Sequence, residues 1–361
     1  MGQPEEPMKK KQTIAGYFPH RGGRSGRLRW AWILMALGAI IACREVPIPA
    51  ASSANAAGAE AAGNGAKAAE ATASGISEAL AASDTAPLPH IDAKRAIEYT
   101  REVTAFGARY MGSENHKKLE RYILSHVKGD EVEDDTFTAD TVEGKFPIRN
   151  IIAKYPGKKD GIIAILGHYD TNYPLRYTGY VGANDGGSST AILLEFANQL
   201  RGKTRDGYSV WLVWTDGEEA VRAWSDSDSL YGTRHLAEKW EKDGTLKKIK
   251  ALMVMDMIAP KDVAILRDSN STPWLLDLIY AAAQKGGYQS HFYAIDTAME
   301  DDHIPFVKRG VPCADVIDMP YGYNDVFHHT PQDTMDKLSP DSLQIVGDTI
   351  LETVRLVDQK P

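Results

Sequence analysis

Beyond about residue 90, the sequence alternates short apolar runs with longer segments of helical apolar spacing. The runs at 162–166 and 210–214 have the length and the residue types of buried strands. Further strands are expected at 151–153 and 252–255, and helices at 96–103, 119–127, 191–200, 275–283 and 343–357. Short buried strands that alternate with helices form a largely parallel sheet. The sequence therefore predicts a single α/β domain with a central mixed, mostly parallel twisted sheet that is covered by helices on both faces.

Charge is distributed unevenly along the chain. The 361 residues carry a formal net charge of −8, but the first 42 contain seven basic and two acidic residues, so the remainder carries −13. An acidic body disfavours nucleic acid as a partner and favours cationic groups such as the N-terminal ammonium of a peptide. The chain has two cysteines, Cys43 and Cys313, so we do not expect an intramolecular disulfide framework.

The first 42 residues have the pattern of a signal peptide or membrane-targeting leader. A basic segment precedes an apolar run at 30–42, which is shorter than the roughly 20 residues of a transmembrane helix. The run ends in the sequence IIAC at 40–43, which resembles the lipobox of bacterial lipoproteins and implies cleavage before Cys43 and acylation of its thiol. The alternative is an uncleaved membrane anchor. In both cases we expect an exported, membrane-tethered protein, in the periplasm or at the cell surface.

Residues 43–89 are predicted to be a flexible linker. Sixteen of the 36 residues at 51–86 are alanine, and large apolar side chains are nearly missing there. Such a segment buries too little apolar surface to offset the entropy lost on ordering. The predicted catalytic domain is therefore 90–361.

Five polar clusters contain candidate site residues; most follow the predicted strands or open the next helix, and the last lies late in the chain. They are GHYDT at 167–171, GANDGG at 182–187, TDGEE at 215–219, MDM at 255–257 and HHTP at 328–331. Ligands of open α/β sheets bind at the carboxyl ends of the strands. Histidines and carboxylates without thiolates suit Zn²⁺ with an open coordination position. After Gly217 the two glutamates can point different ways, so that one binds metal and the other acts as acid or base.

The order of these residues resembles that of the M28 zinc metallopeptidases. The residues that carry the resemblance are His168, Asp170, Asp185, Glu218, Glu219, Asp256 and His329, and it extends from FGAR at 106–109 to the C-terminal helix. Within that family, Trp224 and the runs at 228–237 and 301–306 are similar to the glutaminyl cyclases. The resemblance implies a zinc-aminopeptidase-like fold and the conversion of N-terminal glutamine of peptides or proteins to pyroglutamate, with release of ammonia.

The resemblance also implies roles for individual residues. One zinc ion would be held by Asp185, Glu219 and His329. The catalytic residues would be Glu218 as proton shuttle, with Asp256 and Asp301 as its carboxylate network. The substrate-binding residues would be Trp224, Phe327 and His328. Two rivals stay open: a dinuclear aminopeptidase, in which His168 and Asp256 complete a second metal site, and a non-catalytic exported binding module.

Two positions depart from the pattern of the animal cyclases. Asp315 stands where those enzymes have a histidine, and His328 stands where they have a tryptophan. The resemblance further implies a cis peptide bond between Asp185 and Gly186. Simpler interpretations remain for some residues: Trp224 as a surface aromatic, and Asp301 with its neighbour as a helix cap.

Overall fold

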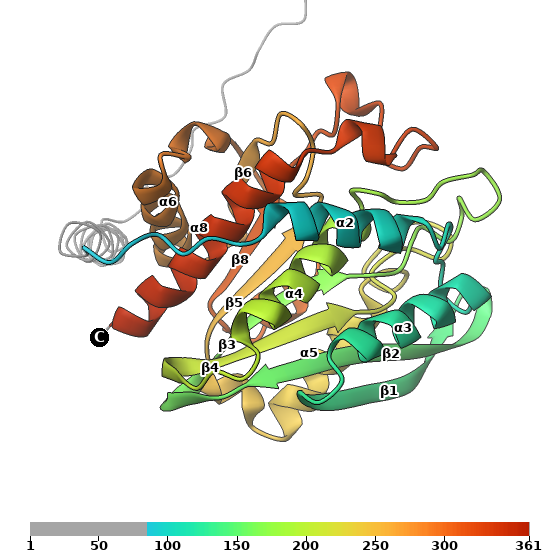
Figure 1. The fold of residues 1–361 in the computed structure, drawn as a ribbon. Coiled ribbons are helices and arrows are strands. Elements are labelled where there is room, and N and C mark those ends of the chain that lie inside the picture. Colours follow the sequence, from blue (N-terminus) through green and yellow to red (C-terminus); the bar gives the residue numbers. More distant parts are fainter. Residues whose placement is uncertain (1–84, 361) are drawn as a thin grey trace, which may run out of the picture. The chain divides into compact units, whose positions relative to one another are not determined.

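The computed structural model describes residues 85–360, and its centre is a six-stranded sheet in the order β1-β2-β4-β3-β5-β8 (Figure 1). The strands are β1 Glu131–Thr141, β2 Gly144–Tyr155, β3 Gly157–His168, β4 Arg205–Thr215, β5 Ile249–Asp256 and β8 Cys313–Ile317. β1 and β2 form an antiparallel hairpin, and β2 is also antiparallel to β4. β3 is parallel to β4 and β5, and β5 is parallel to β8. The sheet is thus mixed, with a parallel half that carries the site.

Helices cover both faces of this sheet. One face packs against α2 Ala93–Thr104, α3 Glu114–His126, α4 Gly187–Leu200, α6 Pro273–Gly286 and α8 Pro340–Gln359. The other face packs against α5 Tyr231–Lys242 and α7 Ile304–Val307. Alternate residues of β3 divide between the two layers: Ile163 and Ile165 join the first core, and Ile162 and Leu166 the second. Because successive side chains of a strand point to opposite faces, a strand buried on both sides reads as a continuous apolar run.

Smaller elements complete the domain. A two-stranded parallel sheet consists of β6 Ile265–Asp268 and β7 Phe292–Thr297. Short 3₁₀ helices lie at Thr245–Lys248, Gln289–His291, Tyr323–Asp325 and Met335–Lys337.

The predicted fold class is confirmed. Every predicted strand and helix lies within an observed one, except that the helix expected at 119–127 extends one residue past the end of α3. The sequence pattern missed four strands. β1 has the sequence EVEDDTFTADT, in which charged and small polar residues face solvent along the edge of the sheet, so its apolar content is too low for a strand prediction. β8 is buried but has five residues, among them Asp315.

The predicted leader, Cys43 and nearly all of the predicted linker lie outside the described residues. Their assignments, and the boundary between linker and catalytic domain, stay predictions. Within residues 85–360, none of the helices combines the length and the apolar character that a membrane span requires.

Candidate active site

The site lies where the parallel strands end. β3 ends at His168, which pairs in register with Thr215 at the end of β4, and β5 ends at Asp256. The turn after β4 carries Glu218 and Glu219, and Asp185 immediately precedes the N-cap of α4. Because parallel strands end at the same edge of a sheet, side chains from distant parts of the sequence converge there.

Three of the predicted metal ligands meet at one imidazole. Nε2 of His329 lies 3.2 Å from Oδ2 of Asp185 and 3.1 Å from Oε1 of Glu219. His329 has a φ of +50°, a left-handed conformation that a non-glycine residue rarely adopts and that costs on the order of 1–3 kcal/mol. Such strain is concentrated at functional sites, where the surrounding structure enforces it.

Asp185 also contacts a second histidine through its other oxygen. Oδ1 of Asp185 lies 3.2 Å from Nε2 of His168, which in turn lies 3.1 Å from Oδ1 of Asp256. One donor atom from each of these three residues lies within 4.8 Å of the others. Asp185 therefore stands between two histidines, in the arrangement that two neighbouring metal positions with a shared carboxylate would need.

Asp185 is held from its backbone and from its side chain. Asp333 accepts hydrogen bonds from the backbone N–H groups of Asn184 at 2.9 Å and Asp185 at 3.1 Å. The hydroxyl of Tyr180 donates to Oδ2 of Asp185. Burial would raise the pKa of Asp185, but hydrogen bonds from the two histidines outweigh it and hold that pKa well below its ordinary value.

The two adjacent glutamates differ in what binds them. Asp170 accepts the backbone N–H groups of Glu218 at 3.2 Å and Glu219 at 3.3 Å, and Gly217, with a φ of +66°, forms the turn before them. Asn172 donates to Oε2 of Glu219 at 2.8 Å, which leaves Oε1 directed at His329.

Glu218, by contrast, has a carboxylate that no donor among residues 85–360 binds. Its nearest cationic group is Nδ1 of His168, at 3.9 Å. One glutamate is thus fixed beside the imidazole of His329, and the other keeps a carboxylate without a hydrogen-bond donor.

Buried carboxyl groups surround Glu218. Burial raises the pKa of Glu218 well above its ordinary value against the opposing charge of His168, and repulsion from Glu219 and Asp301 adds to the rise. Burial and the nearby Asp256 likewise raise the pKa of Asp301. The buried carboxyl groups around Glu218 therefore resist joint ionisation.

The network extends to a strand that the sequence did not predict. Asp315 is fully buried on β8, where burial and then Asp301 raise its pKa well above the ordinary value. Asp302 accepts hydrogen bonds from Thr215 and Thr233, both at 2.6 Å, and burial raises its pKa to about 6. The N-cap of α7 is His303, without a side-chain capping bond, so Asp301 and Asp302 do not cap that helix.

A cavity of about 340 Å³ opens onto these groups. Its lining includes the predicted site residues Asp185, Glu218, Glu219, Trp224, Asp256, Asp301, His328 and His329. Trp224 is 40% exposed and also lines the cavity, so it is both a surface aromatic and part of the cavity wall. Phe327 is not part of this lining: its ring packs against Tyr321, with the centroids 5.4 Å apart.

His168 also stays out of the cavity lining, because its ring lies beneath Asp185 and Asp256, 2% exposed.

The donor set fits a divalent cation. Five carboxylates with exposures between 2% and 9% crowd around two imidazoles, and they are Asp185, Glu218, Glu219, Asp256 and Asp301. Buried charge of one sign is costly unless it is paired or coordinates a metal. Carboxylate oxygens and imidazole nitrogens without thiolates are the ligand types of catalytic Zn²⁺ sites. A metal ion at Asp185, Glu219 and His329 would balance this charge.

The sequence reasoning missed several residues that position the site. Asn172, Tyr180 and Asp333 carry no motif of their own, and their contacts arise when the chain folds. Asp170 was visible as the second half of the His-x-Asp pattern, which is the one signal that could have identified it. The expected cis bond after Asp185 is wrong: within residues 85–360 the one cis peptide joins Met319 and Pro320.

Comparison with known proteins agrees with this geometry. The model of the family described as peptidase family M28 matches residues 150–354, which include all of the converging residues. The chain belongs to peptidase family M28.

Within that family, several of the similar proteins are named glutaminyl cyclases. A glutaminyl-peptide cyclotransferase of Drosophila melanogaster is 31% identical over 268 residues, which cover 66% of this chain and 75% of that protein. The crystal structure of an Acidobacteriales bacterium glutaminyl cyclase superposes with a TM-score of 0.75 at 50% identity, covering 77% of this chain and 98% of that one. A Porphyromonas gingivalis glutaminyl cyclase superposes with a TM-score of 0.67 at 27% identity, covering 74% and 98%.

Proposed function

We propose that the protein is a zinc-dependent glutaminyl-peptide cyclotransferase, which converts N-terminal glutamine of peptides or proteins to pyroglutamate and releases ammonia. The observation that carries the proposal is the difference between the two glutamates at the cavity: Glu219 is fixed beside His329, and the carboxylate of Glu218 is unbonded and buried. The 50% identity to a bacterial glutaminyl cyclase over nearly all of that chain supports the choice of reaction.

Asp185, Glu219 and His329 would hold one Zn²⁺. When bound, the ion supplies Lewis-acid polarisation of a carbonyl oxygen, here that of the substrate γ-carboxamide. Asn172, Asp333 and Tyr180 orient the two carboxylates among these ligands, and such supporting hydrogen bonds fix the ligand geometry.

Glu218 would move the proton. Its carboxylate accepts a proton from the α-ammonium of the substrate, and the freed amine attacks the γ-carbonyl carbon. A new C–N bond forms while the bond to the amide nitrogen breaks. Glu218 gives its proton to the leaving nitrogen, which departs as ammonia, and then accepts the second proton that the ring nitrogen must lose. The attack is intramolecular, so holding the glutaminyl side chain curled in the cavity removes most of the entropic barrier.

The neighbouring carboxyl groups would keep Glu218 suited to both halves of this exchange. Burial raises the pKa of Glu218, and repulsion from Glu219 and Asp301 adds to the rise; burial and then Asp256 raise the pKa of Asp301. A general acid–base group works best when its pKa lies near the working pH. The negative charge of the cavity also attracts the substrate ammonium.

An aminopeptidase is the second candidate, because His168, Asp185 and Asp256 form a further donor set beside the first. One experiment distinguishes the two. The purified, zinc-loaded protein is given Gln-Ala amide and Leu-Ala amide, and pyroglutamate, ammonia and free leucine are measured. Cyclisation without leucine release supports the cyclotransferase, and leucine release without cyclisation supports the aminopeptidase. Metal analysis of the same sample gives the number of zinc ions per chain.

We further propose that the enzyme is exported and tethered to a membrane through its N-terminal segment, where it meets peptide and protein substrates. The proposal rests on the basic leader, the apolar run at 30–42 and the lipobox-like IIAC at 40–43.

A further inference from the structure

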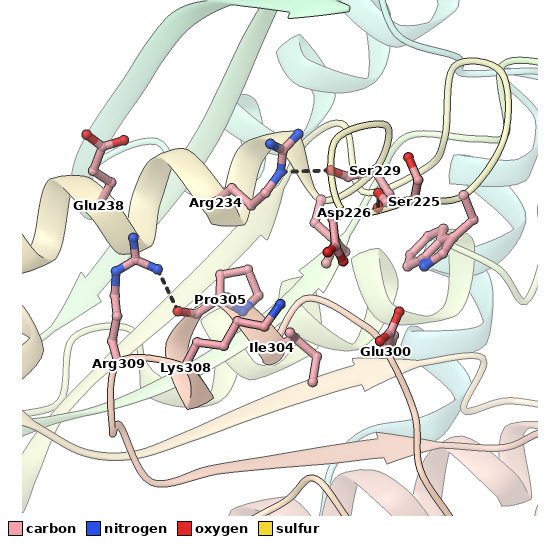
Figure 2. A pocket seen from close by; sticks show the side chains of 12 residues that line it. Ser225, Asp226, Ser229, Arg234, Glu238, Glu300, Ile304, Pro305, Lys308 and Arg309 are labelled. Atoms are coloured by element: carbon pink, nitrogen blue, oxygen red, sulfur yellow. Dashed lines mark hydrogen bonds between the residues drawn. The ribbon is translucent and has the colours of Figure 1, made fainter.

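A second cavity, of about 240 Å³, adjoins the catalytic cavity (Figure 2). Trp224 and Glu300 line both cavities, so the second begins where the first ends. Its walls come from the loop before α5, from α5 itself and from the segment 304–309. We call this second cavity the outer groove. A peptide whose first residue occupies the catalytic cavity can continue into the outer groove past Trp224.

Two cationic side chains in the outer groove have no carboxylate partner. Lys308 is exposed, and its ammonium makes no ion pair or hydrogen bond within residues 85–360. Arg234 donates to the backbone carbonyl oxygens of Ser229 at 3.0 Å and Ser227 at 3.3 Å, and no carboxylate lies within 4.0 Å of it. The guanidinium of Arg234 is thus fixed by neutral groups, and its charge is left uncompensated.

The other charged residues of the outer groove are arranged differently. Arg309 pairs with Glu241 at 3.0 Å, and Glu238 pairs with Lys242. Figure 2 shows Glu300 at one end of the outer groove and Arg309 at the other, with Lys308 and Arg234 on opposite walls between them. Asp226 lies on the Glu300 side of these two cations (Figure 2).

The charge therefore changes sign along the outer groove. The inner end, which the catalytic cavity shares, is negative and suits the ammonium end of a peptide. The middle is positive and suits a carboxylate a few residues farther along. The two free cations stand out because the body of the protein is strongly acidic.

We propose that the outer groove binds the residues that follow the N-terminal glutamine, and that Lys308 and Arg234 select an acidic side chain among them. The inference rests on the proposed cyclotransferase function and adds its substrate class: peptides with Glu or Asp within the first few positions after the glutamine. Exposed ion pairs of this kind correspond to a preference of roughly two- to fivefold. Raising the ionic strength weakens the preference, because salt screens exposed charges.

The test measures kcat/KM for cyclisation of C-terminally amidated pentapeptides of the form Gln-Ala-Ala-Ala-Ala. Single Glu or Gln residues replace alanine at the second, third or fourth position, and the ratio of the Glu to the Gln peptide is the readout. Amidation removes the terminal carboxylate, which would otherwise compete for the same cations. Gln-Ala amide, which offers no acidic side chain to the outer groove, reports the chemical step alone.

Two charge reversals complete the design. Lys308→Glu changes the outer groove, and Lys203→Glu is the matched control. Lys203 is an exposed lysine in the turn before β4, at the opposite end of that strand from the site. Wild type and Lys203→Glu should prefer Glu at one or more positions by roughly two- to fivefold, and Lys308→Glu should lose or reverse that preference.

Each outcome decides one of the two proposals. A wild-type ratio of one at every position overturns the inference, as does a preference that survives Lys308→Glu. A preference that both reversals remove equally reflects the overall charge of the protein and also overturns it. If neither Gln-Ala amide nor any pentapeptide is cyclised, the proposed function itself fails.

Discussion

Replacing Glu218 with glutamine should abolish most turnover without weakening the fold. An amide cannot take the proton from the substrate ammonium, and general acid–base groups contribute roughly 10²–10⁴ in rate, or about 3–5 kcal/mol of transition-state stabilisation. No donor within residues 85–360 binds the Glu218 carboxylate, so the substitution removes no hydrogen bond. It also removes one charge from a group of buried carboxylates, and the melting temperature should therefore equal or exceed that of the wild type.

The assay follows pyroglutamate by mass spectrometry and ammonia by a coupled reaction, on Gln-Ala amide, together with the zinc content and the melting temperature of each variant. Glu219→Gln is the matched control, because it makes the same chemical change one residue away. One oxygen of Glu219 accepts from Asn172 and the other faces His329. An amide there either places its NH₂ group against the Asn172 donor or replaces the oxygen that would bind the ion. Glu219→Gln should lose zinc, and Glu218→Gln should keep it.

Two results would refute the reasoning. Cyclisation by Glu218→Gln at the wild-type rate would show that the residue moves no proton. Loss of zinc from Glu218→Gln, with zinc retained by Glu219→Gln, would reverse the two roles.

Three further predictions concern other parts of the chain. Asp170→Asn should lower stability by about 1–3 kcal/mol and reduce kcat, because two buried backbone N–H groups lose a charged acceptor; urea unfolding and the cyclisation assay measure this, and an unchanged kcat would contradict it. Burial raises the pKa of Asp318 to about 7, so its folded form binds a proton that the unfolded chain releases near pH 4, and stability falls as pH rises between these values. Asp318→Asn keeps an acceptor for the N–H of Ala264. In urea unfolding, the free energy of unfolding of this variant should exceed that of the wild type by about 2–3 kcal/mol more at pH 8 than at pH 5. An equal difference at both pH values would contradict the raised pKa of Asp318. Cys43→Ala should abolish labelling of the protein by a fatty-acid probe and release it from the membrane fraction, whereas unchanged labelling would place the anchor elsewhere.

Much of the fold follows from local pattern. The buried strands at 162–166 and 210–214 were visible because residues that face both cores are all apolar. β1 was not visible, because an edge strand needs only the pairing of its backbone, and its outward side chains can be charged. β8 was missed for a different reason: Asp315 interrupts a five-residue strand, and its burial depends on contacts with distant segments.

The site was predictable to the extent that its residues stand at strand ends. His168, Asp256 and the two glutamates have that position in the sequence, and parallel pairing then brings them to one edge. His329 comes from a loop far along the chain, and only the resemblance to a known family connected it with the others. Asn172 and Asp333 could not be found by either route, since neither lies at a strand end or in a recognised motif.

These two residues nevertheless position the two carboxylates that we propose as ligands, Glu219 and Asp185. A carboxylate that accepts a hydrogen bond from a fixed amide keeps one oxygen in place and presents the other in a single direction, as Glu219 does through Asn172. A carboxylate without such a partner can turn. Glu218 has no such partner, although Asp170 accepts from the backbone N–H groups of both glutamates. A metal ligand must be held before the ion arrives, and a proton shuttle must move between two nitrogen atoms of the substrate. Under the proposed roles, the two chemically identical neighbours differ through a single asparagine, Asn172, which donates to Glu219 and not to Glu218.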